Sequence, residues 1–563
     1  MAESSAVLAT RSDAAEVGRA RWLPWVLAFL VLLAALPPIF TVPPLDRDES
    51  RFAQASKQML ESGDYVVINF QDSPRNKKPA GIHWLQAASV GLFSAAEEAA
   101  IWAYRLPSLA GAIASVLVLL RLGRRLFGDQ AGALAAFILA CCMALQLEAL
   151  IAKTDAVLLL TIVTAQLALW EIWERSKRSG RESWASTDWR ALFWVMLGLG
   201  VLVKGPLAPL VVGITIVTLC IVERRWRWLG RLSPLWGVPL FLALALPWFI
   251  VVTYLRDTGF VEEAASKDLF AKILGGEESH GMPPGFYLAA HLLFFWPGAL
   301  FALPALLAAW RRRRLEPAVL FCLAWLGPSW MLFELVPTKL PHYVLPTYPA
   351  LALLTAWAVG AAAPELGRRW VVWLQALLGF GALAIAAVCI VLPFLAEAGF
   401  LWQSVPSCLI ALAGVGGALR LAWQGRRRRA LLWGGLGSVL FFAWTAAALL
   451  PQMEKFFPSR MLVEEWHRLQ PTGEPPLASS SFHEPSLVFL AGTKTLLGRP
   501  QQLAQYLAER PGAVVLVSDR AMQRFLLACF RRAELPFPLA RLRVFNSSNG
   551  IWEEITYFAG TAR

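Results

Sequence analysis

The sequence has few charged residues for its length. Only 16% of its 563 residues are Asp, Glu, Lys or Arg, and 57% are hydrophobic; soluble globular chains are about 25% charged. This shortage of charge excludes a soluble globular protein and indicates a chain built for lipid. The net charge of +13 does not indicate nucleic-acid binding, because the basic residues cluster in loops between apolar runs.

Cysteine is also scarce, and the cysteines follow no pattern. Neither metal-ligand spacing nor a disulfide framework is apparent, so we expect them to pack in the core as small apolar residues. The sequence shows no required cofactor; a divalent metal stays open, but no spacing of ligand residues supports one. The seven cysteines are Cys141, Cys142, Cys220, Cys322, Cys389, Cys408 and Cys529.

A signal peptide and the common nucleotide-binding motifs are missing as well. No cleavable signal peptide is apparent, because the first apolar run is long and lacks a small-residue cleavage site. The chain has no P-loop, no Asp-x-Asp metal motif after a strand and nothing that resembles a nucleotide-sugar domain. A sugar donor, if the protein uses one, is therefore expected to be a polyprenyl phosphate that arrives through the bilayer.

Long apolar runs, in contrast, are abundant. A helix that crosses the hydrocarbon core needs about 20 mostly apolar residues, and by this criterion we expect about thirteen membrane-spanning helices. The fifth run is short, and a Lys-Gly-Pro break separates it from the sixth. The runs lie near residues 22–42, 104–121, 131–150, 156–173, 191–203, 207–222, 235–254, 286–309, 317–334, 346–362, 370–394, 403–423 and 430–450.

Basic residues mark alternate connections between these runs. Short cytoplasmic loops are enriched in Lys and Arg. Clusters such as RLGRRLFG (121–128), RRRR (311–314) and QGRRRR (424–429) all fall on the cytoplasmic side if the N-terminus is cytoplasmic. An odd number of spans then places residues 451–563 outside the cytoplasm.

The outer side carries amphipathic segments. In the loop 43–103, the stretch ESRFAQASKQMLESG has apolar residues at helical spacing and ends at Gly63, a natural helix C-cap. Two further stretches, at 80–95 and 261–276, have a similar character. We therefore expect three interfacial helices on this face.

The C-terminal part changes character. GAVVLVSD (512–519) predicts a buried strand, 520–532 a helix, and 542–558 a hairpin that turns near Asn549 and Gly550. We expect two domains: an all-α polytopic membrane domain at 1–450 and a small α/β domain at 451–563.

Polar residues interrupt the apolar pattern at four outer junctions. An ionisable group near membrane depth costs about 2.5–3.5 kcal/mol on insertion scales, and such groups usually line a cavity or pair with one another. We expect these residues to form one polar site, in which carboxylates serve catalysis and basic side chains hold a phosphate. They are Asp48 in the first outer loop, Asp155 in AKTDAVLLL, Lys204 in LVKGPLAPL, and Lys339, His342 and Tyr343 in KLPHYVLP.

Simpler interpretations of these residues stay open. Asp48 stands where an N-cap of the next helix is expected, with Arg51 as its i+3 partner. Asp155 is also suited to be a cap or the ion-pair partner of Lys153. Lys204 is suited to be a membrane anchor, with its ammonium group reaching the head-group region.

Several motifs resemble those of the GT-C, protein-mannosyltransferase-like superfamily. RDESRFAQASKQMLESGDYVV, NKKPAGIHWLQAASVGLFS and AYRLPSLAGAIASVLVLLRLGRRLFG are similar to its acidic pair in the first outer loop, its Lys-Pro motif and its Arg-Leu-Pro entry to the second span. AKTDAVLLL, LVKGPLAPL and KLPHYVLPTYPALALL look most like the lipid A aminoarabinose transferases. The resemblance covers residues 22–360 well.

The resemblance implies a GT-C fold and a periplasmic active site in the bacterial inner membrane. It implies transfer of 4-amino-4-deoxy-L-arabinose from undecaprenyl phosphate to lipid A phosphates, which changes the charge of lipopolysaccharide and gives resistance to cationic peptides such as polymyxin. By the matching motifs, Asp48 is the principal catalytic candidate and Asp155 a second essential carboxylate, with Glu49 of the acidic pair as a third.

The same resemblance implies that Lys78 and Lys204 bind the donor phosphate and that Tyr343 lines the lipid pocket. Arg51, Lys339 and His342 complete the expected substrate-binding residues. The expected partners are the undecaprenyl-linked donor, lipid A and membrane lipids, with no nucleic acid, and we expect a monomer. Two alternatives remain: an acceptor that is a protein hydroxyl or another glycolipid, and a lipid transporter, against which stands the lack of a clear inverted repeat.

Overall fold

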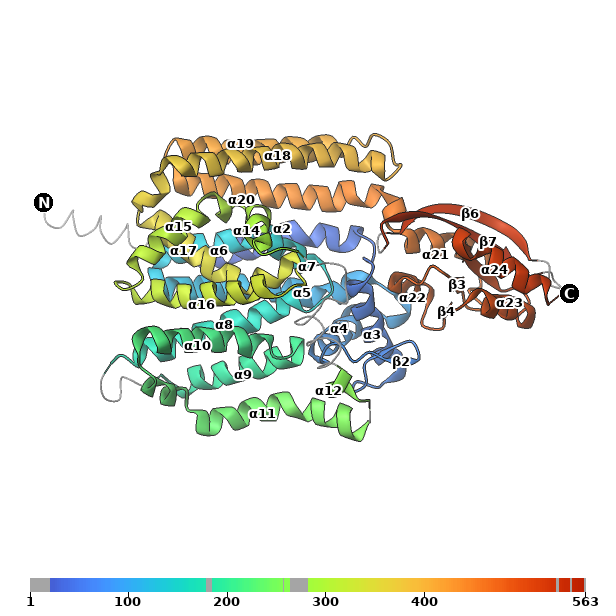
Figure 1. The fold of residues 1–563 in the computed structure, drawn as a ribbon, viewed down its shortest axis with the longest axis horizontal. Helices are drawn as coiled ribbons and strands as arrows, with labels where there is room; N and C mark the ends of the chain where they lie inside the picture. The colour runs from blue at the N-terminus through green and yellow to red at the C-terminus, as the bar shows by residue number, and fades with distance from the viewer. Residues whose placement is uncertain are drawn as a thin grey trace, which may run out of the picture.

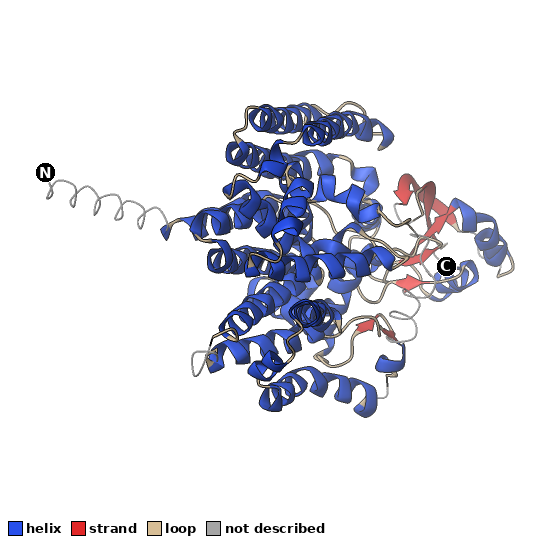
Figure 2. Ribbon diagram, turned by 60° about the vertical axis from the view of Figure 1, so that its left-hand side comes forward, coloured by secondary structure: helices blue, strands red, loops and turns tan. Residues whose placement is uncertain are grey.

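Long helices that run side by side make up most of the molecule (Figures 1 and 2). The computed structural model describes residues 21–178, 185–256, 258–263, 282–532, 536–546 and 549–560. Within these ranges nine helical segments are long and apolar enough to cross a membrane, as expected for a multi-pass membrane protein. They are α2 (Leu23–Thr41), α5 (Ile101–Phe127), α8 (Asp155–Arg175), α11 with η4 (Pro234–Leu255), α16 (Pro317–Leu335), η7 with α17 (Pro341–Gly360), α18 (Arg369–Leu395), α19 (Ser404–Trp423) and α20 with its extension (Arg427–Gln452).

The other predicted spans are bent, short or broken. Helices α6 (Asp129–Ala140) and α7 (Met143–Leu150) form a pair bent by 55°, and together they occupy the predicted run 131–150. The short pair predicted on either side of the Lys-Gly-Pro break appears as α9 (Thr187–Lys204) and α10 (Leu207–Glu223). Gly205 makes the turn between them with a φ of +65°. The count of thirteen spans stays a prediction.

One predicted span is wrong as a single helix. The run 286–309 is divided into α14 (Phe286–Phe294), the 3-10 turn η6 (Gly298–Leu300) and α15 (Ala302–Arg312). The break falls at Pro297, because a proline has no amide hydrogen to donate and its ring clashes with the preceding turn. Apolar composition alone did not reveal this interruption.

Helices α5 and α6 approach each other closely at two glycines. A Cβ atom added at Gly132 would lie 2.5 Å from the backbone nitrogen of Arg124 and 2.8 Å from the carbonyl carbon of Gly123. These neighbours are backbone atoms, which cannot rotate away. Small residues of this kind let membrane helices pack backbone to backbone.

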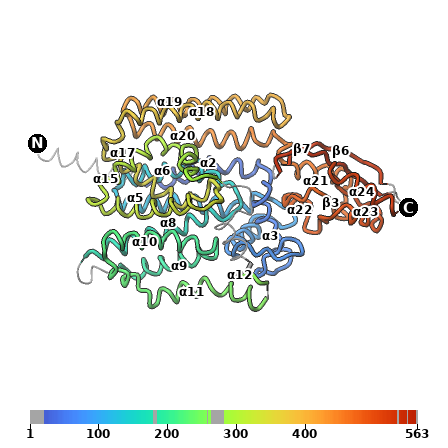
Figure 3. Tube along the Cα trace, in the orientation of Figure 1, coloured from blue at the N-terminus to red at the C-terminus, as the bar shows by residue number. Residues whose placement is uncertain are grey.

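Short elements between α2 and α5 gather at one end of the bundle, beside the C-terminal domain (Figures 1 and 3). They begin with α3 (Asp48–Ser62), which ends at Gly63 with a φ of +71°, as the predicted C-cap requires. The β1–β2 hairpin (Asn69–Phe70 and Ser73–Pro74), α4 (Gly81–Phe93) and η1 (Ala96–Glu98) follow. Of the third predicted interfacial helix, 261–276, only the beginning is described, in α12 (Phe260–Glu263).

The C-terminal residues form a small α/β domain around a five-stranded sheet (red in Figure 2). The strand order is β4-β3-β5-β7-β6; β3 is parallel to β4 and β5, and β7 is antiparallel to β5 and β6. The predicted strand, helix and hairpin are confirmed as β5, α24 and β6–β7. The elements are α21 (Pro458–Leu469), β3 (Ala478–Ser480), α22 (Pro485–Ala491), β4 (Leu496–Leu497), α23 (Pro500–Glu509), β5 (Val514–Ser518), α24 (Asp519–Phe530), β6 (Phe537–Asn546) and β7 (Ile551–Ala559).

The contact between α5 and α6 predicts a sharp response to one methyl group. We expect Gly132→Ala to lower stability by about 1–3 kcal/mol, because the added Cβ overpacks against backbone. Gly213→Ala on α10 is the matched control, since no atom lies within 4 Å of its added Cβ. Thermal unfolding of both variants in detergent measures the difference, and equal melting temperatures would contradict the close packing.

Candidate active site

A buried ion pair holds the start of α3. The carboxylate of Glu49 accepts two hydrogen bonds from the guanidinium of Arg105, from Nε and Nη2, both at 2.8 Å. The same carboxylate accepts the backbone N–H groups of Leu45 (2.9 Å) and Ala152 (2.8 Å). Both charged side chains are almost fully buried, at 1% and 0% exposure. Bidentate geometry with additional donors is what makes a buried pair tolerable.

Arg105 extends this frame to the end of α2. Its guanidinium donates to the backbone carbonyls of Ile39 (2.9 Å), Val42 (2.7 Å) and Pro43 (3.0 Å). Three segments are thereby joined at one point: the end of α2, the start of α3 and the turn before α8. Both oxygens of Glu49 are engaged in this frame, so the geometry gives Glu49 a structural task and does not favour the catalytic role expected for it.

The neighbouring residue, Asp48, is placed quite differently. Asp48 is exposed on the first turn of α3, and Arg47, which precedes the helix, has a φ of +63°. The N-cap position is occupied by Arg47, and Asp48 is the first helical residue, so the simple N-cap interpretation does not describe its position. The exposed side chain of Asp48 contrasts with the buried side chain of Glu49.

Five ionisable side chains meet beside Asp48. The ammonium group of Lys204 lies 2.6 Å from Oδ1 of Asp155, and that of Lys153 lies 3.0 Å from Oε1 of Glu148. His342 joins the two pairs, with Nδ1 3.4 Å from Nζ of Lys153 and Nε2 4.0 Å from Oδ1 of Asp155. The sequence offered Lys153 as the partner of Asp155, but the direct partner is Lys204.

The charges of this cluster shift the pKa of Lys153. Burial alone would lower the pKa of Lys153, but the carboxylates of Glu148 and Asp155 outweigh it and raise that pKa above its ordinary value. Asp48 adds to the same effect, which places its carboxylate in the field of the cluster. Lys153 is therefore a permanent cation at neutral pH.

The other predicted binding residues differ in their contacts. The ring of Tyr343 is 4.9 Å from that of His342 and 5.7 Å from the ammonium group of Lys204. Arg51 is half-buried one turn along α3 from Asp48, and Lys78 is half-buried in the loop before α4. Lys339 makes other contacts: its ammonium group donates to the backbone carbonyls of Met282 and Val336, both at 2.9 Å.

Two members of the site were missed from the sequence. Glu148 is the single charged residue in the run 131–150, and a lone acid in an apolar helix is a signal for a functional or paired group. Arg105 was quoted only as part of the Arg-Leu-Pro motif, although an arginine at the start of a span is a similar signal. Among the described residues, no group of three or more His, Cys, Asp or Glu side chains is arranged to hold a metal ion.

Known proteins resemble this chain in sequence. A family model for dolichyl-phosphate-mannose-protein mannosyltransferase matches residues 77–251. An undecaprenyl phosphate-alpha-4-amino-4-deoxy-L-arabinose arabinosyl transferase of Aeromonas salmonicida is 30% identical over 373 residues, 66% of this chain and 66% of that protein, just under two thirds of its length. A protein of the same name from Pseudomonas paraeruginosa is 28% identical over 507 residues, 88% of this chain and 85% of that one. The chain is therefore similar to the aminoarabinose arabinosyl transferases over most of its length.

A solved structure extends the aminoarabinose arabinosyl transferase likeness to the whole fold. ArnT from Cupriavidus metallidurans, in a crystal structure bound to undecaprenyl phosphate, matches with a TM-score of 0.72. The match covers 95% of this chain and 97% of that chain at 19% identity. It confirms the predicted fold class, a polytopic helical membrane domain with a small C-terminal α/β domain.

The Glu49–Arg105 pair predicts a large loss of stability when one partner is neutralised. Glu49→Gln should destabilise the protein by about 3–5 kcal/mol, because it leaves the buried guanidinium without a counter-charge. Glu98→Gln is the matched control, since Glu98 is an exposed acid in the same loop. Thermal unfolding in detergent is the measurement; if the two variants melt together, Glu49 does not anchor the loop.

Proposed function

We propose that this protein transfers 4-amino-4-deoxy-L-arabinose from undecaprenyl phosphate to phosphate groups of lipid A at the periplasmic face of the bacterial inner membrane. The observation that carries the proposal is the charged cluster of Asp155, Lys204, Lys153, Glu148 and His342 beside the exposed Asp48. The names of the relatives support the sugar and its carrier lipid. The basic loops of the sequence support the orientation, with a cytoplasmic N-terminus and a periplasmic C-terminal domain.

The cations of the site would hold the donor phosphate. An ammonium group has three donor hydrogens, so Lys204 can keep its bond to Asp155 and still donate to a phosphate oxygen. Lys78 and Arg51 lie on the neighbouring loop and helix, and they add positive charge where the donor head group would enter. His342 and Tyr343 would line the same space.

The acceptor needs little activation. A phosphomonoester has a second pKa of about 6, so a lipid A phosphate is already anionic and nucleophilic at neutral pH. In the transfer, an oxygen of this phosphate forms a bond to the anomeric carbon while the bond from that carbon to the donor phosphate breaks. The polyprenyl phosphate leaves with the electron pair, and no proton needs to be removed from the acceptor.

The two aspartates would then do different work. Asp48 is exposed at the start of α3, which suits a carboxylate that stabilises positive charge developing at the anomeric carbon or pairs with the 4-amino group of the sugar. Asp155 is bound to Lys204, so it would orient that ammonium group toward the donor phosphate. Glu148 would do the same for Lys153.

Neutralising either aspartate tests these roles. We expect Asp48→Asn and Asp155→Asn each to lower kcat by about 100-fold or more, because the loss of one preorganised group that stabilises charge typically costs about 10²–10³ in kcat. Purified variants in nanodiscs would be assayed with the undecaprenyl-linked sugar and lipid A. Asp72→Asn, an exposed acid in the β1–β2 turn, should transfer at the rate of the unchanged protein.

Asp48→Asn should keep the melting temperature of the unchanged protein, which separates loss of chemistry from loss of fold. Asp155→Asn removes the counter-charge of the largely buried Lys204, so its melting temperature should fall and its rate is measured at a temperature where it stays folded. Full transfer by either variant would remove the role given to that carboxylate.

Mass spectrometry of lipid A tests the substrate. Lipid A from a bacterium that lacks its own transferase should gain the mass of one aminoarabinose or more when this protein is expressed together with the donor pathway. The Asp48→Asn variant provides the matched control. If no adduct forms on lipid A but the sugar appears on a protein or another glycolipid, the acceptor proposed here is wrong.

A further inference from the structure

The C-terminal domain places one aromatic side chain between the elements that frame the site. Phe489 of α22 is fully buried, and its ring packs edge-on against that of Tyr104 at 5.3 Å between centroids. The same apolar cluster contains Ala53 of α3, Val90 of α4 and Ala152 of the turn before α8. Ala152 is the residue whose backbone N–H donates to Glu49, so Phe489 packs against the frame of the site itself.

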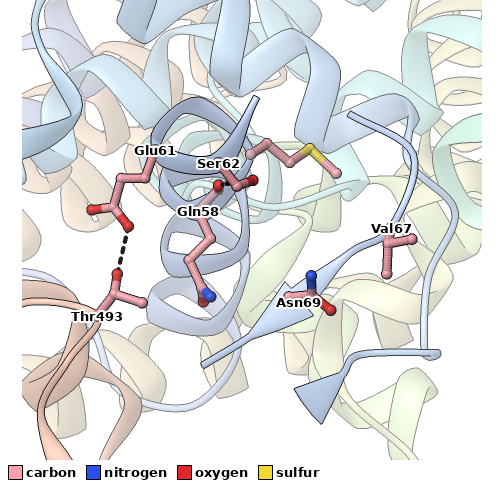
Figure 4. A pocket seen from close by; sticks show the side chains of 7 residues that line it. Gln58, Glu61, Ser62, Val67, Asn69 and Thr493 are labelled. Carbon is pink, nitrogen blue, oxygen red and sulfur yellow. Dashed lines mark hydrogen bonds between the residues drawn. The ribbon is translucent and has the colours of Figure 1, made fainter. Parts of the chain in front are cut away.

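Further along α3, polar contacts join this helix to the C-terminal domain. The ammonium group of Lys57 donates to the carbonyl of Phe489 at 3.2 Å. The side chain of Gln54 donates to Oγ1 of Thr493 at 2.7 Å, and Thr493 in turn donates to Glu61 at 2.7 Å (Figure 4). Gln54 and Lys57 are almost fully buried, so the bonds that they make are largely shielded from water, whereas the bond from Thr493 to Glu61 is exposed.

These contacts border a small hollow. It has a volume of about 200 Å³ and is lined by residues of the last turn of α3 (Figure 4). The side chains around it, Gln58, Met59, Glu61, Ser62, Val67, Asn69 and Thr493, come from α3, from the chain that leads into β1 and from the C-terminal domain.

A third contact lies two residues before Asp48. The hydroxyl of Ser486, at the start of α22, donates to the carboxyl group of Asp46. The Ser486 hydroxyl also lies 2.5 Å from the hydroxyl of Ser459 on α21. Two charged groups face Asp46: Glu484 and Arg51. Burial, reinforced by Glu484, raises the pKa of Asp46 to about 7, although the hydrogen bond from Ser486 and the charge of Arg51 act in the opposite direction.

We propose that the C-terminal domain positions helix α3, which carries Asp48. Helix α22, through Phe489 and Ser486, holds α3 so that Asp48 faces the charged cluster that contains Lys153. This inference rests on the proposed function. Phe489 and Ser486 touch no substrate and are positioning residues. Misplacing a reacting group by about 1 Å can cost 100-fold in rate. A C-terminal domain that fixes the position of α3 can therefore affect the rate of transfer.

The test uses the full-length protein in nanodiscs. Phe489→Ala should lower kcat about tenfold or more and leave the KM for the lipid-linked donor within about twofold, because the donor-binding cations lie mainly outside α3. Phe489→Leu, which keeps most of the apolar volume, should restore most of the rate. Hydrogen exchange should rise in residues 48–62 of Phe489→Ala.

Phe525→Ala is the matched control. Phe525 is also fully buried in the C-terminal domain, but it packs against Phe558 in the core beside the sheet. At a temperature where both variants keep a protease-resistant C-terminal domain, Phe525→Ala should keep kcat and leave exchange in α3 unchanged. Equal losses of kcat in the two variants, or an unchanged kcat in Phe489→Ala, would overturn the inference.

Asp46→Asn tests the contact between Asp46 and Ser486 through its dependence on pH. Ionisation of Asp46 above about pH 7 places a negative charge beside Glu484, and the cost of burial and repulsion outweighs the stronger hydrogen bond from Ser486, so docking of the C-terminal domain becomes less favourable. The kcat of the unchanged protein should therefore fall as pH rises through about 7, and Asp46→Asn, which has no proton to lose, should lack that fall. Identical pH profiles would contradict the role of this contact. An unchanged protein that transfers no sugar at any pH would instead count against the proposed function.

Discussion

The ion pair between Glu49 and Arg105 joins segments that are distant in the sequence at one buried point. Through it, the end of α2, the start of α3 and the turn before α8 share one set of hydrogen bonds. Asp48 and Asp155 lie directly beside these segments, so the distance between the two carboxylates depends on this pair. A charge pair costs free energy to bury, and the geometry here, with every oxygen engaged, is the arrangement that offsets the cost.

The polar cluster shows how a charged site can exist at the end of an apolar bundle. Lys204 and Lys153 are each balanced by one carboxylate, and His342 lies between the two pairs. The site is therefore close to neutral before a substrate enters, while its ammonium groups still have hydrogens to donate. Groups fixed in this way need no rearrangement when charge moves during a reaction.

Much of this arrangement was predictable from the sequence, because it depends on local patterns. Apolar run length located the membrane helices, and β5, α24 and the β6–β7 hairpin followed from strand and turn patterns. Asp155, Lys204 and His342 were expected to meet because each interrupts an apolar run on the same side, and they do meet.

The rest depends on long-range packing. Glu49 and Asp48 are adjacent acids with the same local pattern, and only the fold shows that one is buried in an ion pair and the other exposed. The break at Pro297 and the separate task of Lys339 depend on neighbours that the sequence does not place. The docking of α22 on α3 likewise has no local signal.

The bond between Lys57 and the carbonyl of Phe489 spans 432 positions of the chain. Synthesis proceeds from the N-terminus, and domains generally fold in that order, so α3 emerges long before the helix that covers it. Until the last hundred or so residues have left the ribosome, α3 lacks the C-terminal side chains that contact it. Completion of the packing around α3 therefore waits for the end of synthesis, and a chain that stops early would lack the contacts made by Phe489 and Thr493.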